Sequence, residues 1–362
     1  MQAAVLAVIH LAFTLTPHFL NLSIPVCEHY LPMATTPATQ YTGVIPERRE
    51  LTTVPRFSDK VFRFIVTSGG FASLIILGLI ALFLTLRGLP VFKDMGFGFV
   101  TGFEWSSGDP DAGVPAKFGI GAMLIGTLVV SFIGLIIALP IAVGTALFLT
   151  YYAPDWLRRP LTTMVDLMAA IPSVIYGLWG FFVLMPHAMY WAKLLHKYIG
   201  FLPFFDMPQP VYERSPFIAG IVVGIMIIPI ITAISREVFS QVPLDRVQAA
   251  YALGATKWTM IRSVVLPFGA SGVAGGAMLG LGRAMGETVA IYLVLNIYFL
   301  PNFNVLFSAG GNVASMIVSK FGEAGDYELR GLMAAGMVLF VVTLIVNFLS
   351  DIIVKRTSRT GK

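Results

Sequence analysis

The chain has 362 residues, of which 57% are hydrophobic and only 12% are charged, and it carries a formal net charge of +5. Soluble domains carry roughly 25% charged residues, and a surface that faces water needs charge however large the core is, so the composition excludes an ordinary soluble domain. The single cysteine, Cys27, excludes an internal disulfide framework and a cysteine metal cluster. We expect an all-α polytopic membrane protein with no metal site. The positive net charge does not indicate a nucleic-acid partner, because basic residues of membrane proteins gather on cytoplasmic loops.

The first 56 residues are expected to form an extension ahead of the membrane domain. Residues 1–32 are apolar but lack the basic start of a signal peptide, so we interpret them as the product of an upstream start codon or as a weak extra span. Residues 33–56 are polar and contain several Thr and Pro, which indicates a cytoplasmic tail. We then expect the membrane domain over 57–356 and a short cytoplasmic tail over 357–362.

Six apolar segments follow, each about as long as, or longer than, the roughly 20 residues that a helix needs to cross a bilayer. Helix is the form expected for them, because lipid offers backbone amides no hydrogen-bond partners. We predict one continuous helix per segment, with Pro172 bending the third. The predicted helices cover 64–86, 119–150, 160–185, 217–235, 268–299 and 331–354.

Lysine and arginine are distributed unevenly between the two sides that these segments define. With residues 33–63 placed in the cytoplasm, the inner segments carry fifteen of the 24 basic residues and the outer loops carry eight. Cytoplasmic loops are enriched in basic residues, so we expect both ends of the domain to be cytoplasmic. The outer loop 186–216 mixes aromatic residues with lysines, which is typical of a helix that lies at the membrane interface.

The inner loop between the fourth and fifth predicted helices reads QVPLDRVQAAYALGATKWTMIRSVVLP. After Pro243 its composition favours a helix. Gly254 then favours a sharp turn, because a residue without Cβ tolerates backbone angles that other residues resist. A second helical piece is expected to end at Pro267. Two short helices at an angle predict a hook that projects from the cytoplasmic face.

This loop also carries a spaced motif, made of Gln248, Ala249 and Ala250, then Gly254, then Val264, Leu266 and Pro267. The spacing resembles the Glu-Ala-Ala motif of the permease subunits of bacterial ATP-binding-cassette importers, with Gln in place of the usual Glu and Val in place of Ile. Segments 169–184 and 279–295 are similar to the phosphate-specific permeases, and the second is closer to their C-type subunit.

The resemblance implies a six-helix type I importer permease in a bacterial plasma membrane. It implies that a set of loop residues couples the chain to a cytoplasmic ATPase: Gln248, Ala249, Ala250, Gly254, Leu266 and Pro267. It further implies a phosphate pathway formed by alternating access with a second phosphate permease, beside two copies of the ATPase and an external phosphate-binding protein. The chain is then a transport subunit, not an enzyme, and binds no cofactor. ATP and Mg would be used by the ATPase, since the sequence contains no G-x-x-x-x-G-K-[ST] loop.

Arg283 and Glu287 interrupt the fifth predicted helix, whose midpoint lies near residue 283. A charge at the bilayer centre costs about 2.5–3.5 kcal/mol on insertion scales. Because they are four residues apart on one helix face, the two are expected to neutralise each other. One hypothesis is an ion pair that only holds helices together. The other is that Arg283 faces the pathway and binds the passing oxyanion through its planar fork of donors, while Glu287 positions it and competes with the anion.

Two further groups of residues complete the expected site. Thr288, beside the charged pair, and Ser173 and Tyr176, just after Pro172, are expected to line the pathway. Gly272, Gly276 and Gly280 recur at four-residue spacing and are expected to allow close helix packing, mainly against the partner permease.

The sequence leaves two other functions open. Arg283 indicates an oxyanion without identifying it, so a permease for molybdate or sulfate fits the same residues, and phosphate itself follows from the resemblance. An ion-coupled secondary carrier is the other alternative. The predicted hook discriminates against a carrier, because a carrier has no ATPase to dock.

Overall fold

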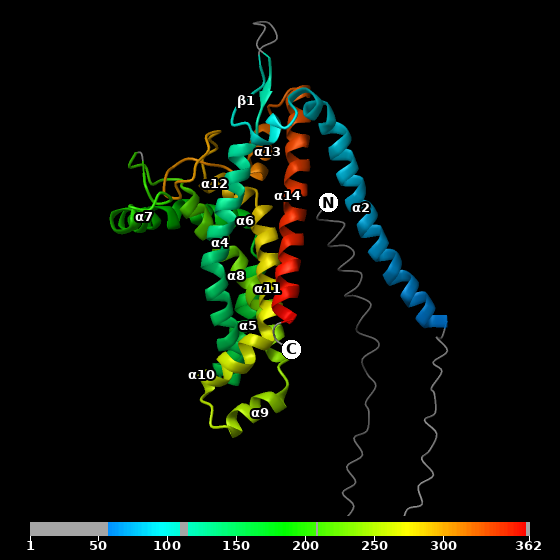
Figure 1. The fold of residues 1–362 in the computed structure, drawn as a ribbon, viewed down its shortest axis with the longest axis vertical. Coiled ribbons are helices and arrows are strands. Elements are labelled where there is room, and N and C mark those ends of the chain that lie inside the picture. The colour runs from blue at the N-terminus through cyan, green and yellow to red at the C-terminus, as the bar shows by residue number, and fades with distance from the viewer. Residues whose placement is uncertain (1–56, 109–114, 208, 360–362) are drawn as a thin grey trace, which may run out of the picture. The chain divides into compact units, whose positions relative to one another are not determined.

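The computed structural model of the protein describes residues 57–108, 115–207 and 209–359 (Figure 1). By its internal contacts the chain divides into Met1–Phe62 and Arg63–Lys362. The first unit is described only at the start of one helix, and all contacts reported below lie within the second. The predicted extension over 1–56 and the last three residues of the predicted tail lie outside the described residues.

Helices account for most of the described chain. In chain order the elements are α2 (Phe57–Met95), α3 (Gly98–Thr101), β1 (Trp105–Ser106), β2 (Lys117–Phe118), α4 (Gly121–Leu147), η1 (Phe148–Tyr152), α5 (Asp155–Ala170), α6 (Ser173–Trp179), η2 (Gly180–Leu184), α7 (Met185–Ile199), α8 (Pro216–Ser240), α9 (Leu244–Ala252), α10 (Lys257–Met260), η3 (Ile261–Val265), α11 (Leu266–Met285), α12 (Val289–Val294), α13 (Val313–Phe321) and α14 (Asp326–Arg359). The three η elements are π-helical turns, and β1 pairs with β2 in an antiparallel hairpin.

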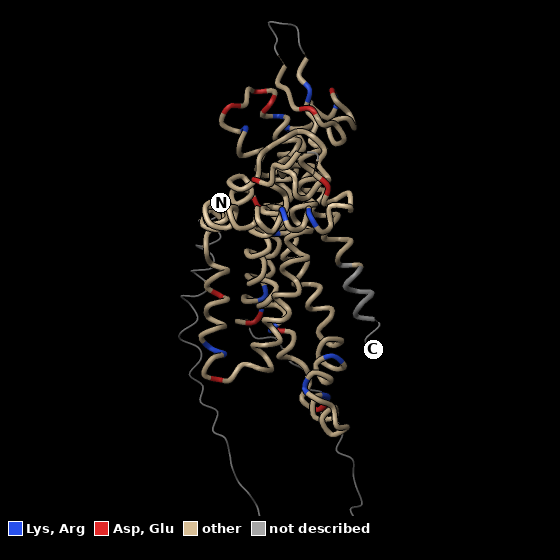
Figure 2. Tube along the Cα trace, turned by 90° about the vertical axis from the view of Figure 1, so that its left-hand side faces the viewer, with Lys and Arg blue, Asp and Glu red and all other residues tan. Residues whose placement is uncertain are grey.

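Among the described residues, six helical segments are long and apolar enough to cross a membrane, which is the number predicted from the sequence. They are Phe57–Met95, Gly121–Tyr152, Ser173–Ile199, Pro216–Ser240, Lys257–Met285 and Asp326–Ser350. Figure 2 shows long stretches of these helices that carry no Lys, Arg, Asp or Glu. The chain is a multi-pass helical membrane protein, and four of the predicted spans lie where they were expected. The third and the fifth do not.

The core forms where α4 and α8 pack along their length, with α11 on the other side of α8 (Figure 1). Val130 and Ala138 of α4 and Ile218 and Ile227 of α8 are fully buried in one apolar cluster. The same cluster takes in Ile291 of the short helix α12. These two continuous helices therefore form the support on which α5, α11 and α12 pack, whereas α14 packs on α11 and α13.

The third predicted span, 160–185, is wrong as one continuous helix. Helix α5 ends at Ala170, Ile171 and Pro172 adopt extended backbone angles, and α6 begins at Ser173. Proline lacks an N–H and disfavours the helical region for the residue before it, so Pro172 ends the helix and does not merely bend it. The segment long enough to cross a membrane is Ser173–Ile199, which runs from α6 into α7.

The fifth predicted span, 268–299, is also wrong as one helix. Helix α11 ends at Met285, residues 286–288 are not helical, and α12 is only six residues long. The backbone groups freed by this break have other partners. The Glu287 carboxylate accepts the Ala290 N–H at 3.1 Å, and the Asn312 side-chain amide donates to the Glu287 carbonyl. A break with its polar groups paired is tolerated inside an apolar bundle.

The second piece of the inner loop does not end at Pro267, as predicted. Lys257–Met285 is one helical segment of 29 residues, and Pro267 lies in the first turn of α11 directly after the π-helical turn η3. A first-turn position suits proline, because the N–H that it lacks needs no partner there. The π-helical turn before it is a single turn inside a longer helix, which is the usual form of this rare structure.

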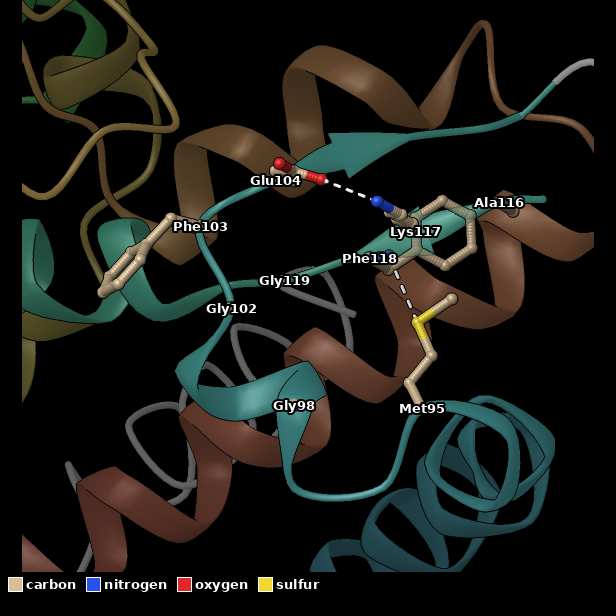
Figure 3. Close-up of a pocket in the computed structure, with 9 residues that line it drawn as sticks. All are labelled: Met95, Gly98, Gly102, Phe103, Glu104, Ala116, Lys117, Phe118 and Gly119. Atoms are coloured by element: carbon tan, nitrogen blue, oxygen red, sulfur yellow. Dashed lines mark hydrogen bonds and ion pairs between the residues drawn. The ribbon is translucent and has the colours of Figure 1, made fainter. Parts of the chain in front are cut away.

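At the end of the bundle opposite α9, the β1–β2 hairpin is joined to α14 through a buried carboxylate (Figure 1). Glu328 accepts the Trp105 indole N–H and the Ser107 hydroxyl, both at 2.7 Å, and Lys320 lies 3.5 Å away. Beside the hairpin is a cavity of about 440 Å³, in which Glu104 and Lys117 form an ion pair at 3.4 Å (Figure 3). This end of the molecule is therefore tied together by polar contacts.

Candidate functional site: two interrupted helices and an arginine

The two breaks that the sequence analysis missed lie beside each other in space. Helix α6, which follows the first break, packs directly on α12, which follows the second. The approach is close because α6 presents Gly177 to α12: a Cβ at this position would lie 2.9 Å from the Cα of Ala290. Interrupted helices place polar backbone groups beside cavities within membrane proteins. The geometry therefore gathers the predicted site residues around two neighbouring breaks.

Tyr176 and Ser173 lie on the α6 side of this site. The Tyr176 hydroxyl donates to the Met168 carbonyl at 2.8 Å and so connects α6 back to α5 across the break. Ser173 is half-buried at the first position of α6, and its hydroxyl has no hydrogen-bond partner among the described residues. The Arg283 guanidinium lies near enough to the Tyr176 hydroxyl to act on it electrostatically.

Arg283 lies in the last turn of α11, with an exposed side chain. It lines a cavity of about 760 Å³ between α11 and α14, to which Leu84 of α2 also contributes. Among the described residues that line this cavity, Arg283 is the only charged one, and Thr343 and Asn347 of α14 are the polar ones. A guanidinium offers five N–H donors in a planar fork. The cavity can therefore hold an anion against Arg283.

The expected neutralisation of Arg283 by Glu287 is wrong. Within the described part of the chain the ion pairs are Lys117–Glu104, Arg158–Asp155 and Lys320–Glu328, and Arg283 takes part in none of them. Because the helix opens after Met285, Glu287 does not share a helix face with Arg283. Its side chain is only 7% exposed and caps α12. The carboxylate thus holds the break together, and the guanidinium is left facing the cavity.

Thr288 makes a local contact. Its hydroxyl donates to the Gly286 carbonyl at 3.2 Å, within the break itself. That bond uses its proton and leaves the oxygen as an acceptor, so Thr288 as placed offers no donor to an anion.

The glycines of α11 fall on two faces of the helix. Gly272, Gly276 and Gly280 lie against α8 of the same chain, where a Cβ on Gly276 would lie 3.2 Å from Ile234 and one on Gly280 would lie 3.0 Å from Ile231. The expected packing against a partner permease therefore does not describe this stripe. Gly275 and Gly282 belong to the other face, which lines the Arg283 cavity.

The inner loop forms a helix, α9, that lies across the end of the bundle (Figure 1). Val247 and Ala250 pack against a buried apolar cluster, whereas Gln248 and Ala249 are exposed. The turn predicted at Gly254 is confirmed, because its φ is +79°, in the left-handed region that favours glycine. The loop therefore presents one face of α9 outward.

Sequence reasoning missed Asn312. This residue is fully buried, caps α13 by accepting the Ser315 N–H at 2.8 Å, and donates to the Glu287 carbonyl. Its local signal is an Asn three residues before a Ser at the start of an apolar run, which is a helix-start pattern. Its long-range contact, 25 residues back along the chain, has no sequence signal.

Known proteins resemble this chain along most of its length. Residues 138–359 match the family of binding-protein-dependent transport system inner membrane components. The chain is 41% identical over 318 residues to phosphate transport system permease protein PstC 2 of Mycobacterium tuberculosis, covering 87% of this chain and 96% of that protein. It is 41% identical to PstC of Pasteurella multocida, covering 74% and 82% of the two chains.

Among solved structures, a chain of a bacterial alginate ABC transporter, in complex with a periplasmic protein that carries an alginate pentasaccharide, has the same fold. The TM-score is 0.52 at 20% identity, covering 85% of this chain and all of that one. The similarity predicted from the Gln248 motif and the two membrane segments is confirmed. The chain belongs to the family of binding-protein-dependent transport system inner membrane components, among the permeases named PstC.

Proposed function

We propose that this chain is one of two permease subunits of an ATP-driven importer of inorganic phosphate, and that Arg283 contacts the phosphate as it crosses. The observation that carries the proposal is the exposed guanidinium at a helix break, in a cavity with no other charge among the described lining residues. A guanidinium matches phosphate oxygens in a bidentate arrangement. The names of the curated relatives favour phosphate over molybdate or sulfate, and a permease subunit over an ion-coupled carrier.

The residues around the breaks have supporting roles in this proposal. Glu287 fixes the backbone that follows Arg283 and leaves the guanidinium free of an internal counter-charge, so the anion meets an available donor. Ser173 adds a hydroxyl at the neighbouring break, and Tyr176 fixes the position of α6. Thr288 contributes only an acceptor oxygen. An arginine without a large set of other donors binds phosphate weakly enough to release it.

The other components act through the end of the bundle that carries α9. Two copies of a separate ATPase bind and hydrolyse ATP with Mg and dock on the exposed Gln248 and Ala249. The uninterrupted segment Lys257–Met285, which includes Leu266 and Pro267, passes their movement to Arg283. An external phosphate-binding protein delivers phosphate at the opposite side, and a second phosphate permease completes the pathway. In this arrangement α9 and both ends of the membrane domain face the cytoplasm of a bacterial cell.

ATP-dependent phosphate uptake into vesicles that hold the reconstituted complex tests the proposal. We expect Arg283→Gln to lower the initial rate about tenfold to a hundredfold, since a hydrogen bond to a charged group contributes about 1.5–3 kcal/mol, while the ATPase stays bound. Arg283→Lys keeps the charge but loses the planar fork of donors, so we expect its uptake rate to lie between the rates of the parental chain and of Arg283→Gln. A parental rate in Arg283→Gln would exclude this residue from the pathway.

Coupling is tested in the same vesicles with Gly254→Pro. Proline fixes φ near −65°, which is incompatible with the +79° observed at this turn, so we expect the ATPase to dissociate and uptake to stop. If the parental chain moved phosphate without any ATPase, the importer would be excluded and a carrier would replace it.

A further inference from the structure

A third cavity, of about 510 Å³, lies between η1, α5 and α8, close to the start of α9. It shares no lining residue with the Arg283 cavity. Three arginines line it, Arg158, Arg159 and Arg236, together with one carboxylate, Glu237. Most of its other lining residues carry hydroxyl groups. The lining thus combines an excess of positive charge with hydroxyl groups.

Two of the three arginines in this cavity have no ion-pair partner among the described residues. Arg158 pairs with Asp155 at 3.4 Å, and the Glu237 carboxylate accepts the Gln241 side-chain amide at 3.1 Å. Neither Arg159 nor Arg236 has an ion-pair partner in the part of the chain that the structure describes. Arg236 is half-buried, and a charge partly removed from water is unfavourable unless it is paired. Two guanidinium groups in one cavity therefore lack an ion-pair contact, and the one carboxylate among the lining residues, Glu237, is bonded to Gln241.

A hydroxyl adds to these donors. Thr162 is half-buried and lines the cavity, and its hydroxyl has no hydrogen-bond partner among the described residues. The hydroxyls of Thr150, Thr163 and Ser240 instead donate to carbonyls of their own segments. Two forks of N–H donors and one free hydroxyl suit a tetrahedral group with several acceptor oxygens, which is the geometry of a phosphoryl group.

We propose that this cavity is a binding site for a phosphoryl oxyanion, held by Arg159, Arg236 and Thr162. The same chemistry is offered by inorganic phosphate and by the head group of an anionic phospholipid. The site does not depend on the function proposed above, because it needs neither Arg283 nor transport.

The test uses the full chain purified in neutral detergent, with chloride keeping the ionic strength constant. Thermal unfolding is followed during titration with inorganic phosphate and, separately, with phosphatidylglycerol dissolved in the same phosphate-free detergent micelles, because a ligand that binds the folded state raises the unfolding midpoint. The variants are Arg159→Gln and the double variant Arg159→Gln/Arg236→Gln. The matched control is Arg262→Gln, which removes an exposed arginine on η3 that does not line the cavity. The same titration of Arg283→Gln shows how much of the response comes from phosphate bound in the Arg283 cavity.

For the probe that stabilises the parental chain, we expect the affinity to fall about tenfold or more in Arg159→Gln and about a hundredfold in the double variant. Arg262→Gln should keep the parental affinity, and any part of the phosphate response that is lost in Arg283→Gln belongs to the other cavity. A response to phosphate identifies free phosphate as the ligand, and a response to phosphatidylglycerol alone identifies the lipid. Because Arg159 is exposed, the single variant decides the question if the double variant does not fold. The site is excluded if neither probe stabilises the parental chain, if the cavity variants bind as the parent does, or if Arg262→Gln weakens binding equally.

Discussion

Helices α4 and α8 are continuous, whereas the segments α5–α6 and α11–α12 are interrupted, although prolines occur in both groups. Pro140 and Pro229 lie inside α4 and α8 without ending them, and Pro172 ends α5. The break after α11 contains no proline at all. A proline alone therefore does not decide where a membrane helix of this protein stops.

Burial alone does not account for the difference. In the apolar part of α8, 61% of the residues are buried, against 33% in Ser173–Ile199 and in Lys257–Met285, but the continuous segments Phe57–Met95 and Asp326–Ser350 have only 0% and 17%. Helix α8 lies between α4 and α11, and neighbours on two sides hold its course. At the two breaks, polar side chains replace the missing backbone bonds, Tyr176 at the first and Glu287 with Asn312 at the second. The continuous helices α4 and α8 give support, and the interrupted segment α11–α12 gives the cavity its charged residue, Arg283.

The largest effect on this arrangement is expected from Asn312→Ala. The change leaves the Glu287 carbonyl without its partner, which costs about 1–3 kcal/mol, and removes the cap of α13, which costs about 1 kcal/mol more. Unfolding of the purified chain by denaturant measures the loss. Asn347→Ala, at an exposed position on α14, is the control and should behave like the parent. If Asn312→Ala had the same free energy of unfolding as the parent, the break would not depend on this residue.

A smaller effect separates the two faces of α11. In Gly272→Ala the new Cβ would lie 2.8 Å from a Val238 methyl group, and overpacking of this kind costs about 1–3 kcal/mol. In Gly275→Ala nothing lies within 4 Å, so the better helix propensity of alanine should stabilise the helix by up to about 1 kcal/mol. Thermal unfolding of both variants gives the sign of each change. Equal shifts of the unfolding midpoint in the two variants would contradict the packing of the Gly272 face on α8.

The smallest effect is expected at the first break. Tyr176→Phe removes the hydrogen bond to the Met168 carbonyl, with a loss of about 0.5–1.5 kcal/mol. Tyr292→Phe is the matched control, because that exposed side chain on α12 has no hydrogen-bond partner in the described residues. If Tyr176→Phe and Tyr292→Phe unfold at the same temperature, the hydrogen bond across the break adds no stability.

The sequence predicted the number of membrane segments, the turn at Gly254 and the presence of a charge deep in the fifth segment. It did not predict the breaks, because counting apolar residues is insensitive to whether the backbone is continuous. The contact of Glu287 with Asn312 spans 25 residues, and the four-residue spacing of Glu287 from Arg283 therefore suggested the wrong partner. The glycine spacing in α11 predicted a packed face correctly but contained no information about which helix packs there.

The contacts of Glu328 bear on the order in which the protein is completed during synthesis. This carboxylate binds Trp105 and Ser107, which precede it by 223 and 221 residues. A chain made from its amino end must therefore carry the hairpin without these partners until α14 has emerged from the ribosome. Contacts between such distant residues form late, because closing a long loop is entropically costly. The hairpin end of the bundle is consequently completed only after α14 has been made.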